Sequence, residues 1–157
     1  VFEGADIQAR SNMLIGAMLA GKSFANSPVA AVHALAYPIG GTFHISHGLS
    51  NSLVLPYVLR FNSVSNKATK DYSEIAPFAF PDINTNQGNQ AVCSEFIDRL
   101  EQLSKKLGLP QRLREVNIPK EACKKMASDA MKQTRLLVNN PREVTENDAL
   151  NIYEAAW

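Results

Sequence analysis

The sequence predicts an all-α domain, an antiparallel bundle of about six or seven helices. Apolar residues recur at helical spacing in almost every segment of the 157-residue chain, and the period-2 alternation typical of β-strands is nearly absent. Serine, proline and glycine stand where such helices would begin and end. We therefore expect residues 1–157 to form a single helical domain that is large enough to bury its own core.

The first helix is expected over residues 7–25. Met13, Ala17, Ala20 and Phe24 follow the i, i+4, i+7, i+11 spacing of one face of a helix. This pattern predicts that the four side chains are buried together.

The second helix is expected over residues 28–36. Ser27 precedes a proline, and this pair is a start signal because the serine oxygen can accept from a free N–H and proline has no N–H to satisfy. Pro38 disfavours helical geometry in the residue before it, and two glycines follow at positions 40 and 41. The sequence therefore predicts a break in the chain at residues 38–41.

The middle of the chain contains two further helices. The spacing of Leu49, Leu53 and Tyr57 predicts a third helix that ends near Asn62, and a shorter one is expected over 67–78. Residues 81–88, which are rich in Asn and Asp, are expected to form a loop.

The C-terminal half carries the clearest helical signals. An apolar stripe over 92–107 is followed by Gly108, which is expected to be a left-handed cap, and Glu101 is expected to pair with Lys105 across one turn. Pro119 begins a further helix. Thr145 and Asp148 have the spacing of a capping box for the last helix.

Composition excludes several classes of function. The formal net charge is +1, which leaves no concentrated basic surface for nucleic acid or anionic lipid. The two cysteines, Cys93 and Cys123, have no CxxC spacing, which argues against a zinc ribbon or a disulfide scaffold and favours the cytoplasm. The longest apolar run, 13–20, is too short to span a membrane.

The three histidines of the chain are clustered. His33, His44 and His47 fall within 15 residues, and the rest of the sequence has none. On one straight helix His33 and His47 would be separated by about 21 Å at 1.5 Å per residue. They can share a metal ion only if the chain reverses between them, and the predicted break at residues 38–41 would allow this. The alternative is an ordinary helix hairpin with histidines at its polar corner.

His44 has no single role on spacing alone. It is a candidate for a further ligand, for a partner that orients a ligand, or for a proton carrier near neutral pH. Two imidazoles are too few for a catalytic metal site, and no Asp or Glu occurs between Asp6 and Asp71. The remaining ligands must come from a distant helix, a partner or a segment outside this chain.

Residues 27–62, SPVAAVHALAYPIGGTFHISHGLSNSLVLPYVLRFN, resemble the signature region of the iron-dependent (group III) alcohol dehydrogenases. The later segments LGLPQRLREV, residues 107–116, and NPREVT, residues 140–145, are similar to C-terminal stretches of the same family in the same order. The resemblance covers essentially the whole chain, and its H-x13-H-G core with the flanking P-x-G-G is specific.

The resemblance implies that this chain is the helical C-terminal domain of a two-domain NAD(P)-dependent oxidoreductase. In this family an Asp and a His from a D-x-x-x-H motif join two later histidines around one divalent ion, Fe²⁺ or sometimes Zn²⁺. The two later histidines match His33 and His47. The D-x-x-x-H motif and the nucleotide-binding domain do not occur in this sequence and are expected upstream of Val1.

The resemblance also implies a substrate pocket for an alcohol or aldehyde, lined by Phe24, Tyr37 and Leu136. Many family members have a histidine, thought to relay protons, at the position of Tyr37. A phenol is a poor relay at neutral pH, so we take His44 as the catalytic substitute. The isolated chain is expected to be inactive, and the full enzyme is expected to be a homo-oligomer.

Two other readings have less support. A helical metallohydrolase would require a further His/Asp cluster, which the sequence lacks. A non-catalytic interaction module would use Met13, Met18 and Phe24 as a face for a partner or for self-association.

Overall fold

The computed structural model describes residues 2–157, and these residues form eight α-helices, two short 3-10 helices and no β-strand. The predicted all-α class is confirmed. The four-residue α7 adds to the expected six or seven helices. The α-helices are α1 (Ile7–Asn26), α2 (Ala31–Phe43), α3 (His47–Asn62), α4 (Asn66–Ala79), α5 (Asn89–Lys106), α6 (Ala122–Ala130), α7 (Thr134–Leu137) and α8 (Glu146–Ala156). The 3-10 helices are η1 (Thr85–Gln87) and η2 (Leu113–Val116).

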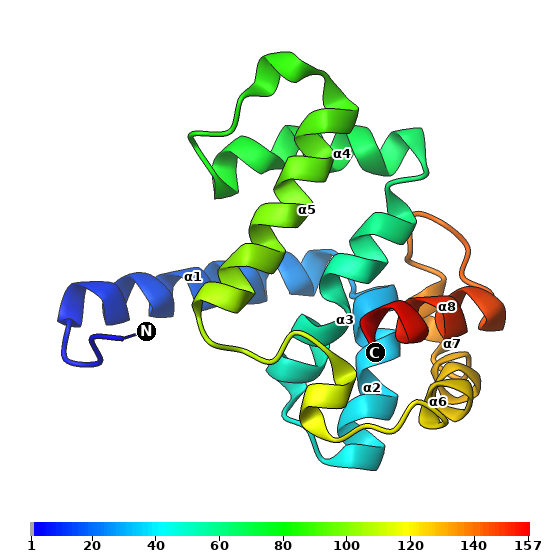
Figure 1. Ribbon diagram of the computed structural model, residues 1–157. Coiled ribbons are helices and arrows are strands. Elements are labelled where there is room, and N and C mark those ends of the chain that lie inside the picture. Colours follow the sequence, from blue (N-terminus) through cyan, green and yellow to red (C-terminus); the bar gives the residue numbers. More distant parts are fainter. Residues whose placement is uncertain (1) are drawn as a thin grey trace.

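The main core lies between α2, α3, α6 and α8. Leu35 and Ile39 of α2, Leu53 of α3, Met126 of α6 and Tyr153 of α8 are almost fully buried in it. Figure 1 shows these helices gathered around α2 in the lower part of the molecule. Since each helix has one apolar stripe, burying the four stripes together is the main favourable term for this part of the fold.

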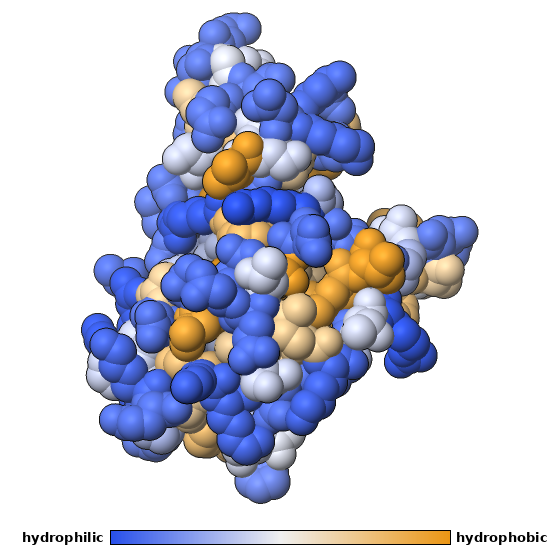
Figure 2. Space-filling view, turned by 90° about the vertical axis from the view of Figure 1, so that its right-hand side faces the viewer, coloured by the Kyte–Doolittle hydropathy of each residue, from blue (hydrophilic) through white to orange (hydrophobic). Residues whose placement is uncertain are grey.

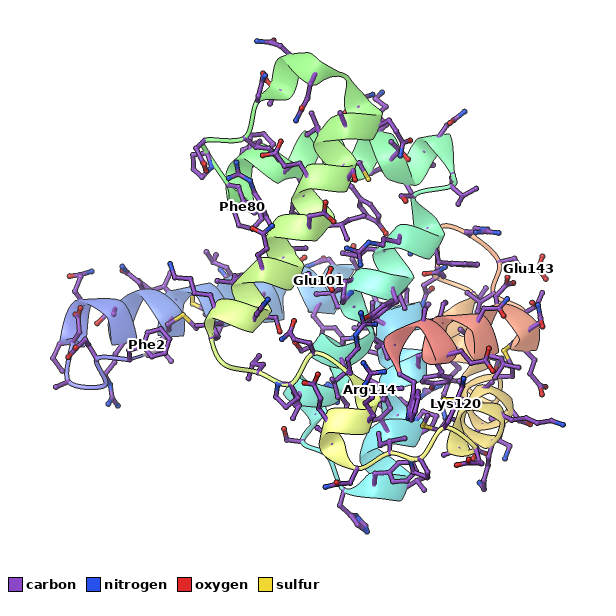
Figure 3. The ribbon with its side chains drawn as sticks, in the orientation of Figure 1. Phe2, Phe80, Glu101, Arg114, Lys120 and Glu143 are labelled. Carbon is purple, nitrogen blue, oxygen red and sulfur yellow. The ribbon has the colours of Figure 1, made fainter. Side chains whose placement is uncertain are left out.

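A smaller core joins α4 to α5. It contains Ala76 of α4, Ile83 of the following loop, and Cys93, Phe96 and Ile97 of α5. In Figure 1 these two helices stand above the main core, and α3 leads into them. Arg60 of α3 pairs with Glu101 of α5 at 2.6 Å across this connection, and Figure 3 shows Glu101 between the two helices.

The expected burial of the first helix is wrong. Met13 and Phe24 are 69% and 59% exposed, Ala17 and Ala20 are exposed, and α1 contains no buried residue. Helical spacing gives the direction of the side chains but not the presence of a partner, and within residues 2–157 no element covers α1. Figure 1 shows α1 extending away from the body of the molecule. The space-filling view in Figure 2 shows a contiguous apolar area amid a mainly polar face.

The predicted break at residues 38–41 is also wrong. Helix α2 starts at Ala31 instead of Pro28 and runs through Pro38 to Phe43. Ser27 lies at the C-terminal end of α1, where it donates its N–H to Ser23. A proline inside a helix removes one backbone hydrogen bond and costs about 3 kcal/mol. Pro38 and its neighbour Ile39 are buried, and that burial offsets the cost.

Most of the local signals in the C-terminal half are confirmed. Gly108 has φ +75°, the left-handed conformation expected of a helix cap. The hydroxyl of Thr145 accepts from the N–H of Asp148, and the carboxylate of Asp148 accepts from the N–H of Thr145. The expected pair of Glu101 with Lys105 is replaced by the ion pair of Glu101 with Arg60. A partner on another helix took precedence over the neighbour one turn away.

Over residues 2–157, none of the helices combines the length and the apolar character needed to cross a membrane.

Candidate metal centre

The turn at residues 44–46 reverses the chain between α2 and α3. His44 has φ +57°, an uncommon left-handed conformation for a residue other than glycine, and its N–H donates to the carbonyl of Gly40. The carbonyl of Ile45 packs against the same glycine, and a Cβ at position 40 would lie 3.2 Å from it. The reversal places His47 at the first position of α3.

This reversal brings the rings of His33 and His47 together. Their centroids are 5.1 Å apart and their planes meet at 54°, although 14 residues separate them in the sequence. His33 is partly buried and His47 is exposed. The rings therefore face a shared space at the surface.

The surroundings of His33 favour its neutral form. Partial burial lowers the pKa of His33 below its usual value, and the nearby His47 lowers it further because two protonated imidazoles repel each other. A neutral imidazole keeps one nitrogen lone pair free, and that lone pair is the donor that metal ions require.

Two polar side chains adjoin His47. The ring of Tyr37, on α2, lies 6.3 Å from the ring of His47. The amide nitrogen of Asn51, one turn along α3, lies 3.1 Å from Nε2 of His47. The other amide atom of Asn51, Oδ1, is buried and has no hydrogen-bond partner among the described residues.

The donor set suits half of a metal site. Two imidazoles match the ligand preference of borderline ions such as Fe²⁺ and Zn²⁺. Between residues 2 and 157, however, no three His, Cys, Asp or Glu side chains lie together as a complete site. The pair fits a metal only if further ligands come from outside these residues.

The remaining predicted site residues are placed as follows. His44 is exposed on the turn and is not part of a three-ligand group with His33 and His47. Tyr37 is 43% exposed beside His47, Leu136 is partly buried on α7, and Phe24 lies exposed near the C-terminal end of α1. Tyr37 is thus the one pocket candidate whose ring lies within 7 Å of a ring of the histidine pair.

Asn51 was not anticipated from the sequence. The available signal is its position four residues after His47, because side chains at that spacing meet on a helix. Asparagine at this distance is common in helices, so the spacing alone does not single it out.

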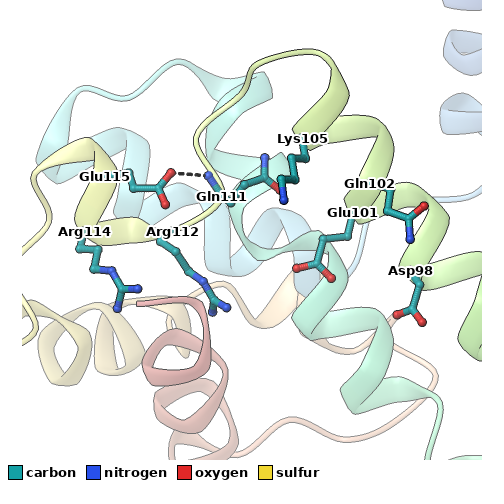
Figure 4. Close-up of a pocket in the computed structure, with 8 residues that line it drawn as sticks. All are labelled: Asp98, Glu101, Gln102, Lys105, Gln111, Arg112, Arg114 and Glu115. Atoms are coloured by element: carbon teal, nitrogen blue, oxygen red, sulfur yellow. Dashed lines mark hydrogen bonds between the residues drawn. The ribbon is translucent and has the colours of Figure 1, made fainter.

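A larger hollow lies elsewhere on the surface. It has a volume of about 530 Å³, and Figure 4 shows acidic, basic and amide side chains from α5 and from the segment around η2 lining it. Arg112 on its rim donates to the carbonyl of Ala155. None of the predicted site residues lines this hollow. Its mixed charges are those of a solvated surface, so it does not compete with the histidine pair as the candidate site.

The chain resembles known proteins along its whole length. Residues 1–157 match the family model described as "Fe-containing alcohol dehydrogenase family, C-terminal". Long-chain-alcohol dehydrogenase 1 of Geobacillus thermodenitrificans is 40% identical over 163 aligned residues, which cover 100% of this chain and 39% of that protein. The 1,3-propanediol dehydrogenase of Klebsiella pneumoniae is 31% identical, with 98% of this chain and 39% of that protein covered.

Solved structures show the same arrangement of helices. A crystal structure of a 1,3-propanediol oxidoreductase superposes with a TM-score of 0.91 at 30% identity, covering 98% of this chain and 39% of that one. An alcohol dehydrogenase from Oenococcus oeni gives a TM-score of 0.90 at 28% identity, with the same coverage.

This chain spans about two fifths of the length of these relatives, since 39% of each is covered. The match of the family model extends over every residue, and the likeness of sequence and fold agrees with it. The chain belongs to the Fe-containing alcohol dehydrogenase family and corresponds to its C-terminal region.

Proposed function

We propose that this chain is the metal-binding part of an NAD(P)-dependent alcohol dehydrogenase that interconverts alcohols with aldehydes or ketones. The observation that supports the proposal most directly is the 5.1 Å approach of the His33 and His47 rings in a chain that matches the family throughout. The names of the relatives, which are alcohol, propanediol and lactaldehyde enzymes, support a small alcohol or aldehyde as the substrate class.

His33 and His47 are proposed to hold Fe²⁺, or Zn²⁺ in its place, through one ring nitrogen each. We propose that the remaining ligands and the nucleotide-binding domain come from polypeptide outside these 157 residues. The greater length of the relatives supports this, since 61% of each lies outside the match. The lack of a third donor beside the pair in the described part of the chain agrees with it.

The bound metal supplies a Lewis acid for the oxygen of the alcohol or carbonyl, and the nicotinamide accepts or donates the hydride. The residues of this chain then have three tasks. His33, kept neutral by burial and by its neighbour, presents a lone pair. His44, on the exposed turn, exchanges protons with solvent. Tyr37, Leu136 and Phe24 form walls of the substrate pocket.

The test compares this chain with a polypeptide extended at its N-terminus to the length of the relatives. The extended protein is expected to retain about one metal ion per chain and to oxidise short alcohols with NAD or NADP. The 157-residue chain alone is expected to retain no metal through gel filtration and to be inactive. In the extended protein His33→Ala and His47→Ala are each expected to lose the ion, whereas His44→Ala retains it and loses activity.

Tightly held, stoichiometric iron or zinc in the 157-residue chain would contradict the proposed sharing of ligands. Retention of the metal in both His33→Ala and His47→Ala would show that the pair is not the site. For the whole enzyme we further propose a cytoplasmic location and a homo-oligomeric state.

The alternative function is a self-associating helical module. The exposed apolar side chains of α1, including Met13, Leu14 and Met18, favour it. This alternative requires no metal, so the metal content of the extended protein separates the two proposals.

A further inference from the structure

Asn51 contacts His47 in two places. Its amide nitrogen Nδ2 lies 3.0 Å from the backbone carbonyl of His47 and 3.1 Å from ring nitrogen Nε2 of the same residue. The amide therefore holds both the backbone and the ring of one histidine from the next turn of α3.

The contact with the carbonyl fixes which way the amide points. A carbonyl oxygen only accepts hydrogen bonds, so the amide atom beside it has to be the NH₂ group of Asn51. The atom 3.1 Å from Nε2 is then also a donor. Since Nε2 faces a donor, it must carry the lone pair, and the proton of the neutral ring lies on Nδ1.

The arrangement leaves one polar atom of Asn51 without a partner. Oδ1 is buried and accepts no hydrogen bond from the described residues. A buried polar atom without a partner costs about 1–3 kcal/mol. An apolar residue at position 51 would avoid this cost, so the stability of α3 does not account for the asparagine.

We propose that Asn51 is a positioning residue that holds the neutral ring of His47 with the lone pair on Nε2. This inference rests on the proposed function in one respect only, that His47 is a metal ligand. Metal ligands among histidines commonly need a neighbour that fixes the tautomer and the angle of the ring. Here the neighbour sets the tautomer through the nitrogen that carries the lone pair.

The experiment measures the tautomer of His47 in the 157-residue chain without metal, by ¹⁵N NMR of the ring at a pH where the ring is neutral. The wild-type chain is expected to show a protonated Nδ1 and an unprotonated Nε2. Asn51→Ala and Asn51→Leu are expected to give a mixture of both tautomers. Asn51→Asp, whose side chain only accepts, is expected to shift the proton to Nε2.

Asn26→Ala is the matched control. Asn26 also donates from its amide to the carbonyl of the residue four positions earlier, Lys22, but it contacts no ring. It is expected to leave the tautomer of His47 unchanged. Thermal unfolding separates positioning from a structural role, because Asn51→Leu removes the unpartnered Oδ1 and should unfold no lower than wild type.

A proton on Nε2 of wild-type His47 would overturn the inference, as would the same tautomer in wild type and Asn51→Ala. Both readouts are made without metal, so they stay informative if the proposed metal site fails. Conversely, a fixed tautomer together with loss of the metal in His47→Ala of the extended protein supports both proposals.

Discussion

The phenol of Tyr153 donates a 2.6 Å hydrogen bond to the backbone carbonyl of Leu35. Tyr153 lies on the last helix and Leu35 lies on α2, two residues after His33. Both side chains are fully buried. Burial also raises the pKa of Tyr153, so the phenol keeps its proton and remains a donor. The end of the chain thus supports the helix that carries one of the two paired histidines.

Tyr153→Phe is expected to lower the free energy of unfolding by about 1–3 kcal/mol, because it leaves the buried carbonyl of Leu35 without its donor. Chemical denaturation measures the change. Tyr57→Phe is the matched control, since the hydroxyl of Tyr57 is buried without a hydrogen-bond partner in residues 2–157. That substitution should be neutral or stabilising. Equal losses in the two variants would show that the bond to Leu35 contributes nothing specific.

The two adjacent glycines of α2 should respond differently to alanine. At position 40 a Cβ would lie 3.2 Å from the carbonyl of Ile45 and 3.6 Å from Oγ of Ser50, whereas at position 41 nothing lies within 4 Å. Gly41→Ala should therefore stabilise the helix by about 0.5–1 kcal/mol. Gly40→Ala should destabilise the fold by about 1–3 kcal/mol, because the turn at residues 44–46 must shift.

Denaturation curves of the two alanine variants test this difference. The spectra of the His33 and His47 rings should change only in Gly40→Ala, because the turn that displaces His47 is the one in contact. A stabilised Gly40→Ala would contradict the close packing of the turn on α2.

The stability of the fold should depend on the protonation of His33. Its pKa is lowered in the folded state, first by burial and second by His47. Between the folded pKa and the ordinary value of about 6.5 the unfolded chain binds more protons than the folded chain. The free energy of unfolding should therefore decrease as the pH falls through this window and level off below the folded pKa.

An NMR titration of the His33 ring checks the cause. In His47→Ala the pKa of His33 should rise but stay below 6.5, because the repulsion is removed and the burial, which is the larger cause, remains. A pKa of His33 that is unchanged in this variant would show that the two rings do not interact electrostatically.

The exposed apolar side chains of α1 should make the 157-residue chain self-associate. Leu14 and Met18 are 75% and 53% exposed on a helix that contains no buried residue. Sedimentation velocity at several concentrations should show larger species as the concentration rises. The double variant Leu14→Glu with Met18→Glu should shift the chain to the monomer.

Phe78→Glu is the control for this prediction. Phe78 is 88% exposed on α4, so it tests whether any exposed apolar side chain has the same effect. It should leave the self-association unchanged. A wild-type chain that stays monomeric at all concentrations would remove the case for α1 as a contact surface.

The sequence by itself determined the features that depend on neighbouring residues. The helical class follows from the spacing of apolar residues, and the left-handed Gly108 and the capping box of Thr145 and Asp148 follow from local backbone chemistry. The expectation that His33 and His47 approach each other also came from the sequence, because the distance along a straight helix excludes any other way for them to share an ion.

The tertiary structure alone decided where α2 ends, what covers α1 and what contacts His47. Pro38 and the glycine pair are local signals for a break, but burial of Pro38 and Ile39 in the core offsets the missing hydrogen bond, so the reversal falls at residues 44–46. The stripe of α1 gives a direction without a partner, and the contact of Asn51 with Nε2 depends on the rotamers of both side chains. Each of these outcomes is set by groups that meet only after folding, and the balance between them cannot be read from residue spacing.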